Sequence, residues 1–202
     1  GLFPLRPRNS HKGSNGHVLC VGGEHGSGGA ILLAADAALH CGAGLASVAT
    51  RAAHVPALLA RRPEAMSHAI EDAGALAALL ARADVVAIGP GLGQGEWGRS
   101  LFAAALACDR PRVLDADALN LLAQSPRRLA AHDVITPHPG EAARLLGVTT
   151  ADVQRDRFAA ANALCDRYGA QVVLKGAGTI VASPGGTPAV ICAGNPGMAV
   201  GG

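Results

Sequence analysis

One pattern recurs along this chain and limits what it can fold into. A short apolar run, often β-branched, leads into a glycine-rich turn and then into an alanine- and leucine-rich stretch with helical spacing. Such alternation predicts an α/β fold with a mainly parallel sheet covered by helices on both faces. The last three apolar runs have no helix between them, so we expect an antiparallel edge there. The length of 202 residues favours one large domain.

The expected strands and helices follow from this pattern. The strands are expected at residues 17–23, 45–50, 84–89, 112–117, 133–137, 171–176, 179–183 and 188–194. The helices are expected at residues 26–42, 54–61, 73–82, 97–108 and 118–124, from residue 140 onward, and at residues 151–168, which give the clearest helical pattern. Residues 1–16 lack an initiator methionine and begin with a proline- and arginine-rich stretch, so we expect a linker from an upstream domain.

Composition argues against several classes of partner. The net charge is only +2 and the basic residues form no block, which argues against nucleic acid as the main partner. No apolar run is long enough to cross a bilayer, and we expect no membrane partner. The five cysteines are scattered without a C-x-x-C motif, which favours free thiols in a reducing cytoplasm. The alanine-rich helices lead us to expect a homo-oligomer.

Unusual residues stand where the strands are expected to end. In open α/β sheets, ligands bind outside the carboxyl ends of the strands. Their shared position therefore predicts one ligand site, built from the segments GGEHGSGG, GPGLGQG, DADALN, TPHPGE, KGAGT and GNPGM.

Three of these segments are glycine-rich. GGEHGSGGA (22–30) matches neither a Walker nor a Rossmann motif, and both an anion-binding helix N-terminus and a plain tight turn fit it. GPGLGQG (89–95) fits either a plain turn or a floor that leaves space for a flat ligand. GNPGMAVGG (194–202) predicts an anion-binding nest of backbone N–H groups, with a helix expected next.

Four side chains are candidates for direct chemistry. Asp115 and Asp117 would point to opposite faces of a continuing strand; Asp117 alternatively caps the next helix, and a metal site formed by both carboxylates is a third, weaker alternative. His138 is held between two prolines, which favours a ligand-contacting role. Lys175 ends a buried strand and leads into GAGT, which favours phosphate binding over a surface hairpin.

Seven segments, in order, resemble a known family over about residues 11 to 202. The family is that of the ADP-dependent NAD(P)H-hydrate dehydratases, found in bacteria as the repair domain joined to an NAD(P)H-hydrate epimerase. The segments are KGSNGHVLCVGG, GSGGAILLAADAALHCGAGL, AIGPGLGQGEWG, LDADALNLLA, ITPHPGEAARLLG, VLKGAGTIVA and GNPGMA.

This resemblance implies a fold, a reaction and a set of residues. The fold would be a ribokinase-like three-layer α/β sandwich over residues 17–202, following an upstream epimerase domain. The lyase reaction would return NADH or NADPH hydrated at C6 of the nicotinamide ring to NAD(P)H, using ADP (or ATP) and Mg²⁺. Ala30, Gly91 and His138 would line the hydrate pocket, and Lys175, Gly176, Ala177, Gly178 and Thr179 would bind the nucleotide phosphates. Gly201 and Gly202 would contribute backbone N–H groups to an anion hole.

The chain also departs from the family pattern. Val200 stands where a hydroxyl residue is common, and the family's catalytic Asp is expected after Gly202, so we expect a chain of these 202 residues alone to be impaired. No residue present matches that Asp, because Asp115 and Asp117 belong elsewhere in the pattern. Two alternatives stay open: a ribokinase-like kinase of a vitamin precursor or sugar, and a non-catalytic nucleotide-binding domain.

Overall fold

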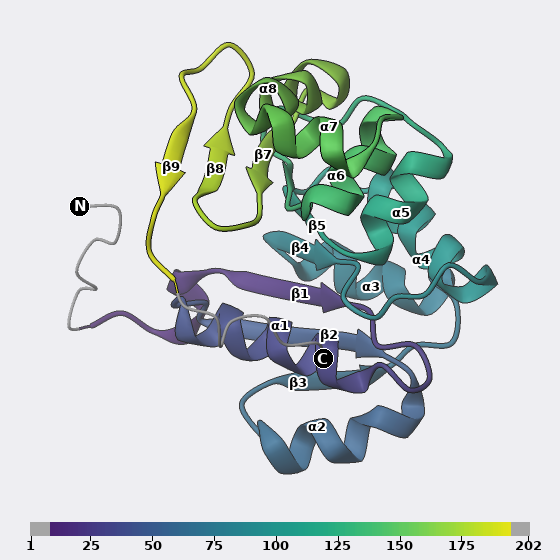
Figure 1. Ribbon diagram of the computed structural model, residues 1–202. Helices are drawn as coiled ribbons and strands as arrows, with labels where there is room; N and C mark the ends of the chain where they lie inside the picture. Colours follow the sequence, from purple (N-terminus) through teal and green to yellow (C-terminus); the bar gives the residue numbers. More distant parts are fainter. Residues whose placement is uncertain (1–8, 195–202) are drawn as a thin grey trace.

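A nine-stranded sheet runs through residues 9–194, the part of the chain that this computed structural model describes (Figure 1). Its strand order is β3-β2-β1-β4-β5-β6-β7-β8-β9. All pairs from β3 to β7 are parallel, and the pairs β7–β8 and β8–β9 are antiparallel. The strands are β1 (His17–Val21), β2 (Leu45–Thr50), β3 (Met66–Ala69), β4 (Val85–Ile88), β5 (Arg112–Leu114), β6 (Val134–Ile135), β7 (Gln171–Leu174), β8 (Thr179–Ala182) and β9 (Ala189–Ile191). The predicted parallel sheet with an antiparallel edge is therefore confirmed.

Helices cover the sheet on two faces. Helix α1 packs on β1 and β2 and α2 lies by β3, whereas α3 to α8 form a continuous series of neighbours. The helices are α1 (Gly28–His40), α2 (Val55–Arg61), α3 (Ala73–Arg82), α4 (Glu96–Ala107), α5 (Asp117–Gln124), α6 (Pro139–Leu146), α7 (Thr150–Arg155) and α8 (Arg157–Tyr168), with 3₁₀ turns at Lys12–Asn15 and Ala52–His54. Among the described residues, no helix is both long and apolar enough to cross a membrane.

The central strand β1 shows how the sequence separates the two cores. Leu19 and Val21 belong to the larger cluster with α3 to α8, while Cys20 packs with Ile31 and Ala35 of α1. Alternate residues of a strand point to opposite faces, so one buried strand supplies both cores. This arrangement is the predicted three-layer sandwich.

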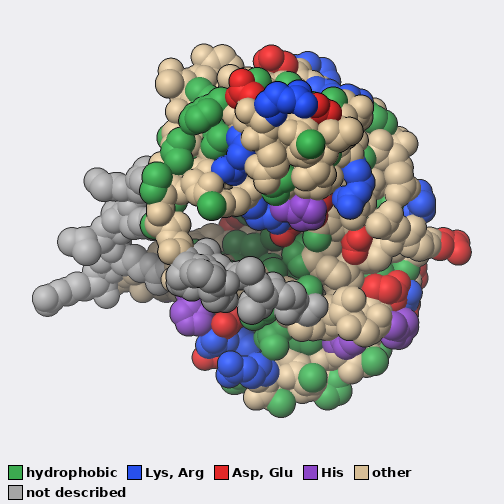
Figure 2. All heavy atoms as spheres, in the orientation of Figure 1, with side chains coloured by type: hydrophobic (Ala, Val, Ile, Leu, Met, Phe, Trp, Pro, Cys, Tyr) green, Lys and Arg blue, Asp and Glu red, His purple; other side chains and the backbone are tan. Residues whose placement is uncertain are grey.

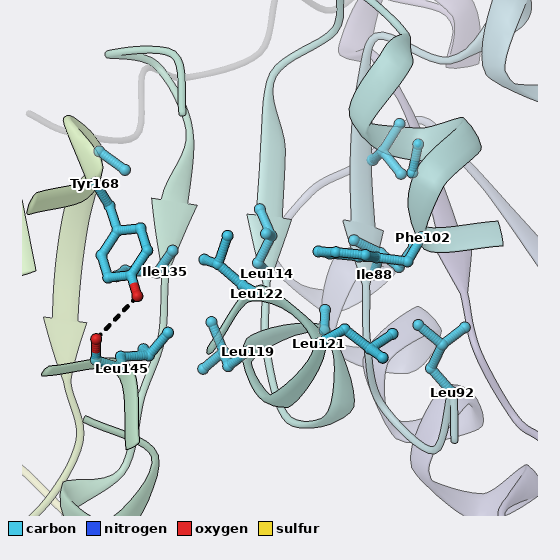
Figure 3. Close-up of a cluster of buried hydrophobic side chains, with 14 of the residues drawn as sticks. Ile88, Leu92, Phe102, Leu114, Leu119, Leu121, Leu122, Ile135, Leu145 and Tyr168 are labelled. Carbon is cyan, nitrogen blue, oxygen red and sulfur yellow. Dashed lines mark hydrogen bonds between the residues drawn. The ribbon is translucent and has the colours of Figure 1, made fainter. Parts of the chain in front are cut away.

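The larger core also buries a tyrosine (Figure 3). Tyr168 is fully buried at the end of α8, and its hydroxyl donates to the carbonyl of Leu145 over 2.9 Å. This bond satisfies the polar end of the ring and ties α8 to α6.

Two predictions about the elements are wrong. Strand β3 was not expected, because its sequence MSHA has no β-branched residue and its side chains are only partly buried at the sheet edge. The helix expected at residues 151–168 is two helices, because Asp156 leaves the helical conformation at φ −146° and ψ 89°. Its carboxylate instead caps α8, accepting from the N–H of Ala159 over 2.9 Å.

Apart from β2, which has the expected bounds, the strands that were expected are shorter than expected. Each of them ends earlier, as at Asp115–Ala116 and Lys175–Gly176, and β4, β6 and β9 also begin one residue later than expected. Residues 12–16 contact the start of β2, where the carbonyls of Asn15 and Gly16 accept from the N–H of Gly44. The assignment of residues 1–16 to a linker stays a prediction.

Candidate functional site

The loops singled out in the sequence lie at one edge of the sheet. Strands β1, β4, β5, β6 and β7 run parallel, so their carboxyl ends share this edge. The loops after them begin at Gly22, Gly89, Asp115, Thr136 and Lys175. The expected common location is therefore observed for five of the six segments, whereas residues 195–198 of the sixth, GNPGM, lie outside the described residues.

The loops after β1 and β4 are bonded to each other. The N–H of Glu24 donates to the carbonyl of Gly91 over 2.6 Å, and the N–H of Gly23 donates to that of Pro90 over 3.1 Å. Gly91 has φ +59°, and a Cβ on it would lie 2.6 Å from the Cβ of Ser27 and 3.5 Å from that of Ala30. The structure thus brings together Ala30 and Gly91, two of the three predicted hydrate-pocket residues.

An ion-pair cluster holds the first of these loops. The Arg51 guanidinium donates to both carboxylate oxygens of Glu24, over 2.7 and 3.1 Å, and to Glu71 over 2.7 Å. Its carbon lies 4.5 Å from the ring centre of Trp97, which adds a cation–π contact. The hydrogen bonds that Arg51 donates to Glu24 lower the pKa of Glu24 and raise the pKa of Arg51. Sequence reasoning missed this cluster because its members come from four separate elements.

Asp117 accepts hydrogen bonds from the loop after β4. It is the first residue of α5, so the helix-cap alternative is wrong: the cap position belongs to Ala116, at the unusual φ of +48°. The Asp117 carboxylate accepts from the N–H of Gly93 over 2.9 Å and from the Gln94 side chain over 3.2 Å. It therefore fixes the shape of the GPGLGQG segment.

Asp115 faces a different partner, Lys175. The Lys175 ammonium donates to the Asp115 carboxylate over 2.6 Å, and the Glu141 carboxylate lies 4.0 Å from it. The N–H of Lys175 donates to the carbonyl of Pro137 over 2.8 Å. The Lys175 side chain is 41% exposed, so its ammonium is oriented by carboxylates on a side chain that a ligand can reach. The two aspartates thus have separate partners, and no group of three or more metal-binding side chains occurs within residues 9–194.

His138 combines a structural contact with an exposed ring. Its Nδ1 accepts from the N–H groups of Gly140 and Glu141, and the Glu141 carboxylate accepts from the N–H of His138 over 2.8 Å. This reciprocal cap starts α6. Because Nδ1 accepts, the neutral ring carries its proton on Nε2. The side chain is 51% exposed, and its Nε2 lies 3.5 Å from a carboxylate oxygen of Glu141.

The segment Lys175–Thr179 is a turn between β7 and β8. Gly176 and Gly178 have φ values of +145° and +70°, which favour glycine. The Thr179 hydroxyl donates to the carbonyl of Gly176 over 3.1 Å. The Arg157 side chain, absent from the sequence predictions, donates to carbonyls on both sides of the turn. No motif marks this arginine, since it precedes the turn by a whole helix.

The surface around these loops carries both signs of charge. On the face shown in Figure 2, acidic and basic side chains are interspersed rather than gathered in one basic patch. The predicted anion site at Gly201 and Gly202, and the departure at Val200, lie outside the described residues.

Comparison with known proteins identifies the family. The family model described as NAD(P)H-hydrate dehydratase matches residues 18–202. The chain is 53% identical to the bifunctional NAD(P)H-hydrate repair enzyme Nnr of Coxiella burnetii, over all of this chain and 42% of that protein. It therefore spans about two fifths of that relative's length.

Two solved structures are similar as well. A ribokinase-like superfamily protein from Enterococcus faecalis matches with a TM-score of 0.89 and 33% identity, over 98% of this chain and 70% of that one. The ADP/ATP-dependent NAD(P)H-hydrate dehydratase of Bacillus subtilis, co-crystallised with ATP/Mg²⁺, matches with a TM-score of 0.83 and 30% identity, over 98% and 72%. The fold is thus ribokinase-like, as predicted, and the chain belongs to the NAD(P)H-hydrate dehydratase family.

Proposed function

We propose that this domain dehydrates hydrated NADH and NADPH to NAD(P)H, with conversion of ADP to AMP and phosphate. Family membership supports this activity. The observation that carries it is the Lys175 ammonium, which two carboxylates orient at the start of a glycine turn while it stays partly exposed. A cation beside free backbone N–H groups is the arrangement that binds phosphates.

The proposed reaction has two steps. The terminal phosphoryl group of ADP is transferred to the C6 hydroxyl of the hydrate, which leaves AMP. The nitrogen lone pair of the ring then expels phosphate, and loss of a C5 proton restores the C5–C6 double bond. The first step needs mainly positioning and charge stabilisation. Lys175 would neutralise phosphate charge, and His138 would donate its Nε2–H to the hydrate beside Ala30 and Gly91.

Mg²⁺ is part of the proposal. Carboxylate and phosphate oxygens are its preferred ligands, and one or two carboxylates plus the phosphates of a bound nucleotide suffice. Asp115 and Glu141, the carboxylates nearest to the Lys175 ammonium, are the side chains that would hold it. When bound, the ion supplies further charge neutralisation at the phosphates.

Turnover of the hydrate by the full-length protein tests this function. We expect recovery of the NADH absorbance that needs ADP or ATP, with AMP (or ADP from ATP) and phosphate formed in equal amounts. A phosphorylated vitamin or sugar without hydrate repair would instead support the kinase alternative. Nucleotide binding without any turnover would support a non-catalytic domain.

The proposal extends to the protein's setting. An epimerase domain in the same parent chain is supported by the bifunctional name of the Coxiella burnetii relative. A cytoplasmic location is supported by the five free cysteines. A homo-oligomer stays a prediction that light scattering checks.

A further inference from the structure

Arg157 makes an unusual set of contacts with the turn Lys175–Thr179. One terminal nitrogen of its guanidinium donates to the carbonyls of Ala177 and Gly178, over 2.8 and 2.9 Å. The other donates to those of Leu174 and Lys175, over 3.1 and 3.3 Å. One side chain from the first turn of α8 thus gathers carbonyls from both arms of the turn.

These contacts fix the direction of the turn's N–H groups. In a trans peptide, the carbonyl of one residue and the N–H of the next point in opposite directions. The carbonyls of Lys175 and Ala177 point at Arg157, so the N–H groups of Gly176 and Gly178 point away from it. Within residues 9–194, neither N–H group donates to a protein acceptor. The turn therefore presents free donors on the side opposite Arg157.

The guanidinium also brings an unbalanced charge. No carboxylate of the described residues lies within ion-pair distance of it, and its Nε is buried without a hydrogen-bond partner. A partly buried cation with only carbonyl partners costs free energy to keep. An anion on the far side of the turn would be attracted to this charge and would meet the free N–H groups.

The Arg157 guanidinium packs closely against the backbone of Gly176. A Cβ on Gly176 would lie 2.9 Å from a terminal nitrogen of Arg157. The guanidinium therefore fills the space directly behind the glycine backbone and leaves the other side of the turn as the approach for a ligand.

We propose that Arg157 is a positioning residue for the adenine nucleotide: it holds the turn Lys175–Thr179 with its N–H groups facing the nucleotide phosphates. This inference rests on the proposed function, because it takes that turn as the nucleotide loop. Arg157 acts through the turn and does not touch the substrate.

The variants Arg157→Gln and Arg157→Lys test this role, with Arg167→Gln as the matched control. Arg167 lies on the same helix and donates to the carbonyl of Leu146, away from the turn. The measurements are the Kd of ADP by calorimetry, the KM of ADP, the KM of the NADH hydrate and the thermal midpoint. For Arg157→Gln we expect the Kd and KM of ADP to rise about tenfold or more. The KM of the hydrate should stay within about twofold of the unchanged protein, and millimolar guanidinium should partly restore ADP binding.

Arg157→Lys separates charge from shape. Lysine keeps the positive charge but lacks the planar fork that reaches several carbonyls at once, so we expect an intermediate loss of ADP affinity. If Arg157→Gln does not fold, the ADP affinity of Arg157→Lys tests the role of Arg157 in its place. The control should bind ADP as the unchanged protein does.

Two results for a folded Arg157→Gln protein would overturn this inference and leave the proposed function standing. They are an unchanged ADP affinity and equal increases in the KM values of ADP and of the hydrate. If Arg157→Gln does not fold, unchanged ADP affinity in Arg157→Lys would do the same. Should the unchanged protein bind no adenine nucleotide, the proposed function and this inference would fail together.

Discussion

At the scale of single residues, Lys175 is the side chain on which nucleotide use depends most. Its ammonium lies 2.6 Å from Asp115 and beside the turn that carries the free N–H groups. We predict that Lys175→Met lowers kcat/KM for ADP by about tenfold or more, because one cation at the phosphates is lost.

The chain offers a matched control for this change. Lys12 is the only other lysine, and it is exposed. Steady-state kinetics of Lys12→Met should match those of the unchanged protein within about twofold. Equal activity of the two variants would remove Lys175 from the nucleotide site.

The variant Gly91→Ala tests whether Gly91 lines the hydrate pocket. A side chain there is strained at φ +59° and collides with Ser27, so Gly91→Ala should shift the loop that faces Ala30. We predict that the KM of the hydrate rises several-fold while the KM of ADP changes little. Gly95→Ala, in the same segment and with open space around it, is the control. A higher KM for ADP alone would contradict this assignment.

Sequence reasoning succeeds best for residues whose backbone is unusual. The prolines around His138 and the glycines after Lys175 mark those positions from local sequence alone. It failed for Arg157 and Arg51, because their partners lie on other elements and arginine is the chain's ordinary basic residue. The role of Asp117 was missed for the same reason: its partner Gly93 lies 24 residues earlier in the chain, in the loop after β4.

At the scale of elements, the pair of Glu24 and Arg51 ties the loop after β1 to that after β2. The pKa of Glu24 lies below its ordinary value of 4.5 in the folded protein, mainly because Arg51 donates to it. The pair therefore stabilises the fold above that pH, and the stabilisation is lost as the pH falls through the lowered pKa.

The variant Glu24→Gln checks this pH dependence. Denaturant unfolding at a series of pH values should show a smaller fall in the free energy of unfolding below pH 4.5 than in the unchanged protein. Glu71→Gln, which removes the other carboxylate of Arg51, should keep the steeper fall. Identical pH profiles for Glu24→Gln and the unchanged protein would count against the pair.

A buried ion pair joins the amino ends of β5 and β6, at the edge of the sheet opposite the candidate site. The carboxylate of Asp133 is fully buried and accepts two bonds from the Arg112 guanidinium, over 3.0 and 2.7 Å. Removing one partner leaves an uncompensated buried charge, so we predict that Asp133→Ala destabilises the fold by about 3–5 kcal/mol. Glu64→Ala, at a largely exposed ion pair, should cost less than about 1 kcal/mol by the same denaturant measurement. A cost below 1 kcal/mol for Asp133→Ala would contradict this account.

The sheet order shows what local patterns can and cannot predict. Buried strands such as β1 and β4 are apolar runs and were predicted, whereas β3 depends on its pairing with β2 rather than on its own residues. The break at Asp156 was missed because aspartate fits both a helix surface and a helix cap. Only the tertiary contacts of α7 and α8 distinguish these alternatives.

At the scale of the whole molecule, the thiols report on global folding. Burial raises the pKa of Cys20 to about 12, and its side chain is inaccessible, whereas Cys41 and Cys192 are exposed. We predict that a thiol reagent modifies Cys41 and Cys192 in the native state but reaches Cys20 only on unfolding. Mass spectrometry of labelled peptides across a denaturant series checks this order. Labelling of Cys20 under native conditions would indicate that the α1 layer opens locally.

The central claim is that the domain uses a nucleotide phosphoryl group to remove the C6 hydroxyl of hydrated NAD(P)H. The most direct measurement follows the oxygen of that hydroxyl. The hydrate is prepared in water enriched in heavy oxygen and turned over by the full-length protein with ADP in ordinary water. The account predicts one heavy oxygen atom in each phosphate released, detected by mass spectrometry. Heavy oxygen recovered in water, with unlabelled phosphate, would contradict it.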